Sequence, residues 1–152
     1  MNLPRLSVLA AGLVLVASVG AAQFRNDRFG TPVRFVTPGS FNGAFLFCRI
    51  SFRNQPRDDG DGWYVDYPRA DLNLSFRLSE LTKTPISRDG TGMINHVVIR
   101  LTDPELCRCP FIMMTEPGGA YFDEFEAEAL GDYLLKGGFL WAARPRTVPR
   151  AV

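Results

Sequence analysis

The chain has 152 residues, of which 46% are hydrophobic, 22% are charged and 12% are aromatic. This length suits one domain rather than two, and the hydrophobic content excludes a wholly disordered chain. The 17 basic and 16 acidic residues nearly cancel, so the charge gives no electrostatic basis for binding nucleic acid or an anionic membrane surface.

The first 22 residues have the layout of a secretory signal peptide, so we assign them to a leader and not to the fold. Arg5 makes the start of the leader positive, residues 6–19 are apolar, and small residues end at Ala22. The apolar run of about 14 residues is shorter than the roughly 20 that span a bilayer. We predict cleavage between Ala22 and Gln23, a secreted or periplasmic protein, and membrane contact only through the transient signal peptide; an uncleaved anchor is the alternative.

Residues 23–43, which are rich in arginine, glycine, proline and asparagine, are expected to form an extended segment with at most a short strand at 33–36. In residues 44–53 apolar and polar side chains alternate, which predicts a half-buried strand near an edge of the sheet. Cys48 lies on the apolar face of this strand and Arg49 on the other.

The middle of the chain combines loops with one helix. Residues 54–62 contain three aspartates without the spacing of an EF-hand, so we predict a solvated turn and not a calcium site. A short strand is predicted at 63–68, and Asp71 is predicted to cap a helix that extends to about residue 82. Residues 87–95 are expected to form a flexible connection.

The clearest local pattern is strand, helix, strand near the end of the chain. Residues 111–115 are an apolar run of strand length, followed by a proline-glycine turn. Asp123 and Glu126 have the spacing of a capping box, which predicts the start of a helix. Gly137 is predicted to end that helix, and a second strand begins at Phe139.

Two strands joined by a helix predict a parallel, right-handed β-α-β unit. The β-branched residues 97–99 are typical of another buried strand. Because strands and helices alternate from residue 63 onward, the sequence predicts a three-layer α/β fold with mostly parallel strands.

The three cysteines, Cys48, Cys107 and Cys109, are an odd number for a secreted protein. A bridge between Cys107 and Cys109 would be strained, because neighbouring residues on one strand face are poorly placed for bridging. We expect a structural, unpaired role for all three, and leave open a bridge from Cys48 to either of the others. His96 is the only histidine, so we expect no metal site.

The sequence lacks the common motifs of catalysis and nucleotide binding. It contains no G-x-S-x-G elbow, no Walker A loop and no G-x-G-x-x-G fingerprint. Cys48 has no neighbouring glycine to form the tight turn that a class I amidotransferase nucleophile needs. We therefore expect no cofactor and lean against catalysis.

The best candidates for a ligand site are acidic and aromatic residues near predicted strand ends. Glu116 directly follows the strand at 111–115, and Asp66 lies near the end of the short strand that contains Trp63 and Tyr67. Ligand crevices in open α/β sheets lie at the carboxyl ends of the strands. Together with Arg69, these residues would suit a sugar or a peptide-like ligand. In the structural alternative, Asp66 pairs with Arg69 and Glu116 holds its own turn.

Several ordered blocks of the sequence resemble the DUF4159 family of bacterial proteins. They are residues 62–74, residues 101–106, and the set of short matches between residues 110 and 140. The resemblance covers residues 44–141. It implies a class I glutamine-amidotransferase-like (flavodoxin-like) α/β fold and a secreted or periplasmic setting, and it implies no established activity.

One departure from the family concerns the segment after Trp141. In the family this strand continues into paired aspartates and a Trp-Gly sequence, and the domain extends for many tens of residues. Here residues 142–152 contain three arginines, two prolines and no acidic residue. Our hypothesis is a frameshift or a mispredicted gene end, so that residues 44–141 form an incomplete domain and residues 142–152 an aberrant basic tail.

Two functions from different classes follow from the sequence. The first is an exported, non-catalytic module that binds an unidentified ligand or protein partner. The alternative is a hydrolase that acts on a carbohydrate or cell-wall-like substrate through Asp66 and Glu116. The sequence sets neither the ligand nor the oligomeric state.

Overall fold

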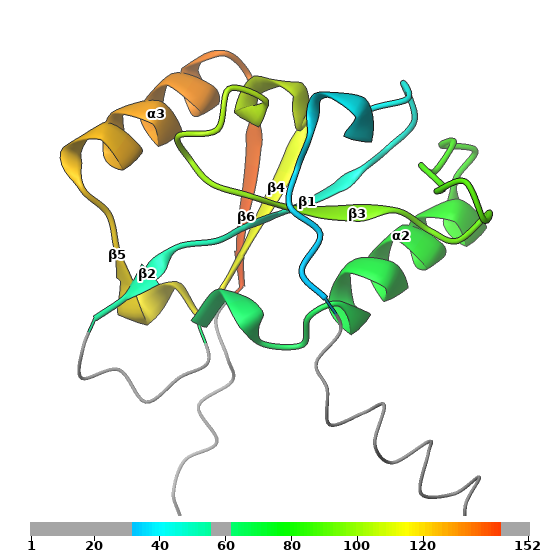
Figure 1. Ribbon diagram of the computed structural model, residues 1–152, viewed down its shortest axis with the longest axis horizontal. Coiled ribbons are helices and arrows are strands. Elements are labelled where there is room, and N and C mark those ends of the chain that lie inside the picture. Colours follow the sequence, from blue (N-terminus) through cyan, green and yellow to red (C-terminus); the bar gives the residue numbers. More distant parts are fainter. Residues whose placement is uncertain (1–31, 56–61, 144–152) are drawn as a thin grey trace, which may run out of the picture. The chain divides into compact units, whose positions relative to one another are not determined.

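The computed structural model describes residues 32–55 and 62–143 (Figure 1). The predicted leader, its cleavage point between Ala22 and Gln23, and nearly all of the basic tail lie outside the described residues. Within them, no helix is long and apolar enough to cross a membrane.

The described residues form a four-stranded parallel sheet with the order β3-β1-β4-β6. The strands are β1 (Phe47–Ile50), β3 (His96–Ile99), β4 (Phe111–Thr115) and β6 (Phe139–Ala143). A separate antiparallel pair joins β2 (Arg53–Asn54) to β5 (Ala120–Tyr121). The predicted α/β class with a mostly parallel sheet is confirmed.

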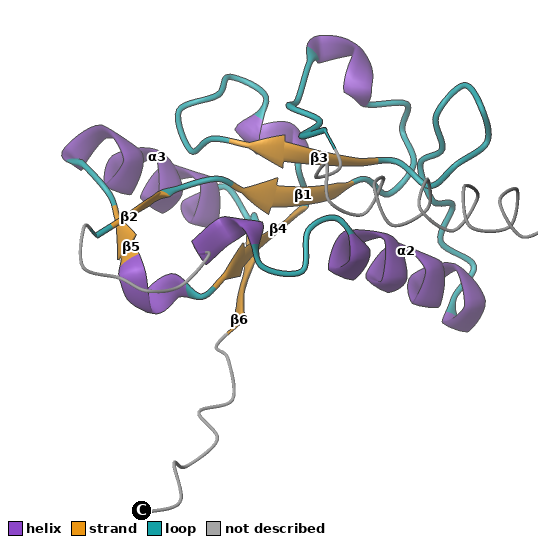
Figure 2. Cartoon of the chain, turned by 60° about the horizontal axis from the view of Figure 1, so that its bottom comes forward, coloured by secondary structure: helices purple, strands orange, loops and turns teal. Residues whose placement is uncertain are grey.

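Two helices lie on opposite faces of this sheet, α2 (Arg69–Leu81) and α3 (Glu124–Leu135) (Figures 1 and 2). Tyr133 of α3 belongs to the apolar core with Cys48 and Ile112. On the other face, Asp71 of α2 binds Arg49 of β1. The sheet is therefore the middle of three layers, as predicted.

The predicted position of the first strand at an edge of the sheet is wrong. β1 lies between β3 and β4, and all four of its residues are buried. The prediction failed because Arg49 interrupts the apolar pattern and was taken to face water. Its side chain is in fact fully buried and binds Asp71.

The capping box predicted for α3 is confirmed. Asp123 Oδ1 accepts a hydrogen bond from Glu126 N at 2.9 Å, and Glu126 Oε2 accepts one from Asp123 N at 3.1 Å. These two bonds satisfy backbone groups that the first turn of a helix leaves free. The predicted glycine stop is also found, since Gly137 follows the helix with φ of +90°.

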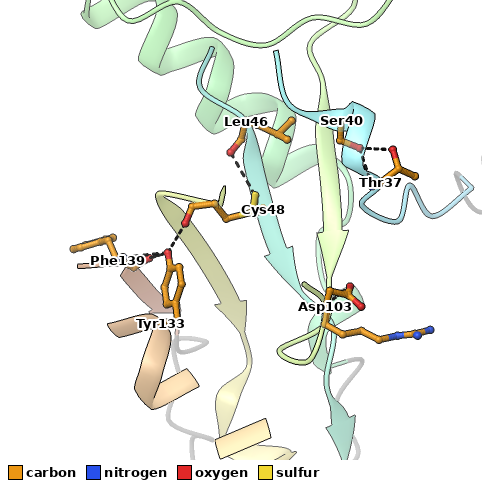
Figure 3. Close-up of a disulfide and its surroundings, with 9 residues drawn as sticks. Thr37, Ser40, Leu46, Cys48, Asp103, Tyr133 and Phe139 are labelled. Carbon is orange, nitrogen blue, oxygen red and sulfur yellow. Dashed lines mark hydrogen bonds between the residues drawn. A yellow bond between two sulfur atoms is a disulfide. The ribbon is translucent and has the colours of Figure 1, made fainter. Parts of the chain in front are cut away.

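Tyr133 joins the end of α3 to the starts of two strands (Figure 3). Its hydroxyl donates to Cys109 O at 2.8 Å and accepts from Phe139 N at 3.1 Å. A Cβ atom at Gly138 would lie 2.2 Å from the Tyr133 ring, so this position requires glycine. Tyr133 lies on the predicted apolar stripe of α3, although Ala127 and Leu134 on the same stripe are exposed.

The predicted strand at 63–68 is wrong. The chain instead forms a short 3-10 helix, Gly62–Tyr64, followed by a turn. Gly62 and Asp66 have φ of +57° and +58°, values that extended strands do not adopt. The aromatic side chains pack on one another: the Trp63 ring lies 5.3 Å from that of Tyr64 and 6.2 Å from that of Tyr67.

Asp71 does not cap α2 as predicted. It is the third residue of the helix, and the N-cap position belongs to Pro68. The carboxylate of Asp71 is directed instead into the sheet, where Arg49 binds it.

The connection at 87–95, predicted to be flexible, is an ordered turn. Arg88 and Ile94 form an antiparallel bridge across it. The Asp89 carboxylate accepts from Thr91 N at 3.0 Å and from Met93 N at 3.1 Å. Bonds from Thr91 are the main cause that lowers the pKa of Asp89 to about 2. The short strand predicted at 33–36 is reduced to a single bridge between Phe35 and Val98.

Cys48 and Cys109 form a disulfide (Figure 3). Cys107 is a free, exposed cysteine. The expectation of three unpaired cysteines is therefore wrong, and one of the two bridges left open by the sequence is present. The disulfide joins the centre of β1 to the segment that enters β4, across a sequence separation of 61 residues.

We expect the double substitution Cys48→Ala and Cys109→Ala to lower the free energy of unfolding by about 2–4 kcal/mol, because the bridge restricts a long loop of the unfolded chain. Urea unfolding measures the loss, and Cys107→Ala is the control that should leave stability unchanged. Alkylation of the unreduced, denatured protein should label one cysteine only. Labelling of all three would show that the bridge does not form.

Candidate functional site

A hollow of about 330 Å³ lies where the strands of the sheet end. Its walls come from several elements. Residues 51–53 follow β1, Arg100 follows β3, and Glu126 lies in the first turn of α3. Seven of the described residues line it, namely Phe35, Ser51, Phe52, Arg53, Trp63, Arg100 and Glu126. We call this feature the carboxyl-edge hollow.

Arg49 holds the backbone beside Trp63 in place. Its Nη1 donates to Trp63 O at 2.9 Å and to Val65 O at 3.0 Å. The same atom donates to Thr115 Oγ1 at 3.1 Å, and Thr115 in turn donates to Gly62 O at 2.9 Å. The turn that carries Trp63 is thus bonded to β1 and to β4.

The charge of Arg49 is compensated by Asp71. Arg49 Nε donates to Asp71 Oδ1 at 3.0 Å and to Oδ2 at 3.2 Å, and Nη2 also binds Oδ1. Both side chains are fully buried. Burial raises the pKa of Asp71, and the neighbouring Arg49 opposes that rise. A buried arginine without such a partner would be strongly destabilising.

Arg53 forms one charged wall of the hollow and is bridged by two carboxylates. Its Nη2 lies 2.8 Å from Asp123 Oδ2 and 2.6 Å from Glu126 Oε2. A hydrogen bond from Glu126 N, followed by the contact with Arg53, lowers the pKa of Asp123. This bridge connects β2 to the first turn of α3.

Arg100 forms a second charged wall. Its Cζ lies 5.3 Å from the centroid of the Phe35 ring, over the face of that ring. Its backbone N donates to Asp103 Oδ2 at 2.9 Å. Arg100 is exposed, whereas Phe52 at the base of the hollow is buried.

Comparison with known proteins shows the family to which this chain belongs. The family model described as "Domain of unknown function (DUF4159)" matches residues 49–146. The chain belongs to the DUF4159 family. The matched range includes every lining residue of the carboxyl-edge hollow except Phe35. No curated protein matches the chain.

Of the site residues predicted from the sequence of this DUF4159 chain, Trp63 lines the hollow. Glu116 lies close to the same turn, where its Oε2 accepts from Gly62 N at 3.2 Å. Tyr67 is buried, with its hydroxyl 3.3 Å from His96 Nε2. Asp66 and Arg69 are exposed and do not line this hollow.

Six lining residues were missed, namely Phe35, Ser51, Phe52, Arg53, Arg100 and Glu126. The rule that selected Glu116, a polar residue directly after a buried strand, applies equally to Ser51 and Arg100. Ser51 lay inside the strand predicted at 44–53, whereas β1 ends at Ile50. No local signal in the sequence identifies Phe35.

A second hollow, of about 210 Å³, lies where strands begin, before β4 and β6. Cys107, Tyr133 and Lys136 are among its lining residues. Among residues 32–55 and 62–143, no three Cys, His, Asp or Glu side chains are placed to hold a metal ion.

We expect Asp71→Asn to lower the free energy of unfolding by about 3–5 kcal/mol, because it leaves the Arg49 charge buried without a partner. The matched control is Glu80→Gln, an acid-to-amide change on the same helix. It breaks an exposed pair with Arg77 at 2.7 Å and should cost less than about 1 kcal/mol. Urea unfolding compares the two variants, and equal losses would contradict the assigned role of Asp71.

We expect His96 to make the protein less stable in acid. Burial, with the charges of Arg34 and Arg49, lowers the pKa of His96 from 6.5 to about 4. Below pH 6.5, His96 therefore binds a proton in the unfolded chain. In the native chain His96 stays neutral until the pH falls to about 4. The contribution of the neutral His96 to the free energy of unfolding is complete above pH 6.5 and is lost as the pH falls to about 4. Its size is about 3 kcal/mol.

Unfolding of His96→Gln and of the native sequence between pH 7 and pH 4.5 measures this effect. The carboxylates contribute equally to both proteins. The difference between the two slopes of unfolding free energy against pH therefore isolates the contribution of His96. Parallel slopes would contradict a buried neutral histidine.

Proposed function

We propose that this DUF4159 chain is an exported, non-catalytic ligand-binding module whose ligand occupies the carboxyl-edge hollow. The observation that carries the proposal is the position of that hollow. The hollow lies beside the end of β1. The next strand along the chain, β3, pairs with one side of β1, and the later strands β4 and β6 follow on the other side, so the strand order reverses at β1. Ligand crevices of open α/β sheets lie at such a reversal.

The proposal extends to the fold. Numbered along the chain, the four parallel strands have the spatial order 2-1-3-4. This is the order of the first strands in flavodoxin-like sheets. It supports the class I glutamine-amidotransferase-like arrangement that the family resemblance implies, over the proposed domain 44–141.

The lining of the hollow supports a sugar or a peptide-like ligand. Trp63 supplies a half-buried ring, and Ser51, Arg53 and Arg100 supply polar groups around it. Aromatic rings with a few polar groups are typical of small-ligand sites.

The contacts of the carboxylates favour binding over hydrolysis. A glycosidase needs two carboxyl groups that face each other across the substrate, roughly 5–10 Å apart. Glu116 Oε2 is already bonded to Gly62 N, and Asp66 lies exposed in a turn. Glu126, which lines the hollow, is bound to Arg53.

Two observations support export. Residues 1–22 have the pattern of a signal peptide. The disulfide between Cys48 and Cys109 is a bond that forms in oxidising compartments such as the periplasm. We propose that residues 23–43 lead from the leader into the domain.

The Trp141→Phe variant tests ligand binding, because it leaves Trp63 as the single tryptophan. We expect a saturable change of Trp63 fluorescence with at least one member of a panel of neutral and acidic oligosaccharides, muropeptides and short peptides. A bound ligand at a hundred times its Kd should raise the free energy of unfolding by about 2.7 kcal/mol.

Trp63→Ala should abolish binding, whereas Phe76→Ala, an exposed aromatic on α2, should preserve it. Thermal unfolding reports on both variants. Binding that survives Trp63→Ala would exclude the hollow. Mass spectrometry of the panel after incubation should find no product, and a product lost in Glu116→Gln would establish the hydrolase instead.

A further inference from the structure

The two arginines that line the carboxyl-edge hollow are in different electrostatic states. Arg53 is bridged by Asp123 and Glu126 at 2.8 Å and 2.6 Å. Two negative groups therefore surround one positive group, and neither carboxylate is free to bind a cationic ligand. The positive charge of Arg53 is already paired with these two carboxylates.

Arg100 has no such compensation. Among the residues that the structure describes, no carboxylate forms an ion pair with its guanidinium, and no hydrogen bond from that group is found. Asp103, the nearest acidic partner in the hydrogen-bond network, accepts from the Arg100 backbone. Among the described lining residues, the Arg100 guanidinium is thus a charge without an ion-pair partner.

The guanidinium of Arg100 contacts the Phe35 ring. The guanidinium lies over the Phe35 ring, with Cζ 5.3 Å from the ring centroid. Stacking uses the face of the planar group, whereas its N–H donors point outward in its plane. Those donors remain available, and two parallel N–H groups match the two oxygens of a carboxylate or phosphate.

We propose that the ligand carries an oxyanion bound by Arg100, and that it is an acidic saccharide whose ring lies against Trp63. This inference rests on the proposed ligand-binding function of the hollow. The Trp63 ring supplies the apolar contact that a sugar face needs, and Arg100 supplies the charge. A neutral sugar offers no oxyanion for a charge-assisted hydrogen bond with Arg100.

Trigalacturonic acid and its methyl ester test the charge requirement, because the ester keeps the rings and removes the carboxylates. In the Trp141→Phe protein, we expect the acid to bind about tenfold more tightly than the ester, the scale of one charge-assisted hydrogen-bonding contact. The preference should shrink between 50 and 500 mM NaCl, since the hollow is open to solvent.

Arg100→Gln should lower the affinity for the acid to that for the ester. Arg100→Lys should keep part of the preference for the acid, because lysine retains the charge but lacks the planar guanidinium. The matched control is Arg108→Gln. Arg108 also stacks on a phenylalanine, with Cζ 4.2 Å from the Phe41 centroid, but it does not line the hollow. Its loss should leave both affinities unchanged.

The other outcomes separate this inference from the proposed function. Equal binding of acid and ester would overturn the oxyanion requirement and leave the binding module standing. Inorganic phosphate that competes as well as the acid would show a site for the free anion and overturn the saccharide. A C-terminal peptide carboxylate with the tightest binding would overturn it as well. No response of Trp63 to any probe would overturn the binding module itself.

Discussion

The buried pair of Arg49 and Asp71 is the contact on which the arrangement of this domain depends. Arg49 lies in the middle of the central strand, where a charge without a partner would be very costly. Asp71 supplies the compensation from α2, 22 residues further along the chain. The remaining donors of the guanidinium bind Trp63 O, Val65 O and Thr115 Oγ1. One side chain therefore positions a helix, a turn and a neighbouring strand at once, and the docking of α2 and the position of Trp63 cannot vary independently.

The opposite face of the sheet is held by different chemistry, so the two faces are anchored separately. There the Cys48–Cys109 disulfide joins β1 to the segment that enters β4, and the Tyr133 hydroxyl joins α3 to that same segment. At the other end of α3, Arg53 bridges Asp123 and Glu126. The carboxyl-edge hollow has one wall at Trp63, which Arg49 holds, and another at Arg53, which binds Asp123 and Glu126. Contacts within the protein itself therefore hold both walls in place.

Local signals in the sequence were sufficient where local bonds decide the structure. The capping box of α3, the glycine stop after it and the two flanking strands were all predicted correctly, because each depends on residues within a few positions of one another. The predictions failed where a distant partner decides. Arg49 looked like a solvated residue because Asp71 lies outside any local window, and Asp71 looked like a helix cap for the same reason. The strand predicted at 63–68 failed because the rings of Trp63, Tyr64 and Tyr67 pack on one another around a turn.

Glu116 illustrates the same limit within the candidate site. Its place directly after β4 correctly located the carboxyl edge of the sheet, but not the hollow, because which loops meet there depends on contacts between residues far apart in sequence. Its backbone adopts φ of 45°, which is unfavourable for a glutamate, and its carboxylate accepts from Gly62 N. That bond attaches the start of the Trp63 turn to β4, while Arg49 attaches Trp63 O to β1. The aromatic wall of the hollow is therefore anchored to two neighbouring strands, and the strained Glu116 backbone belongs to that anchoring framework.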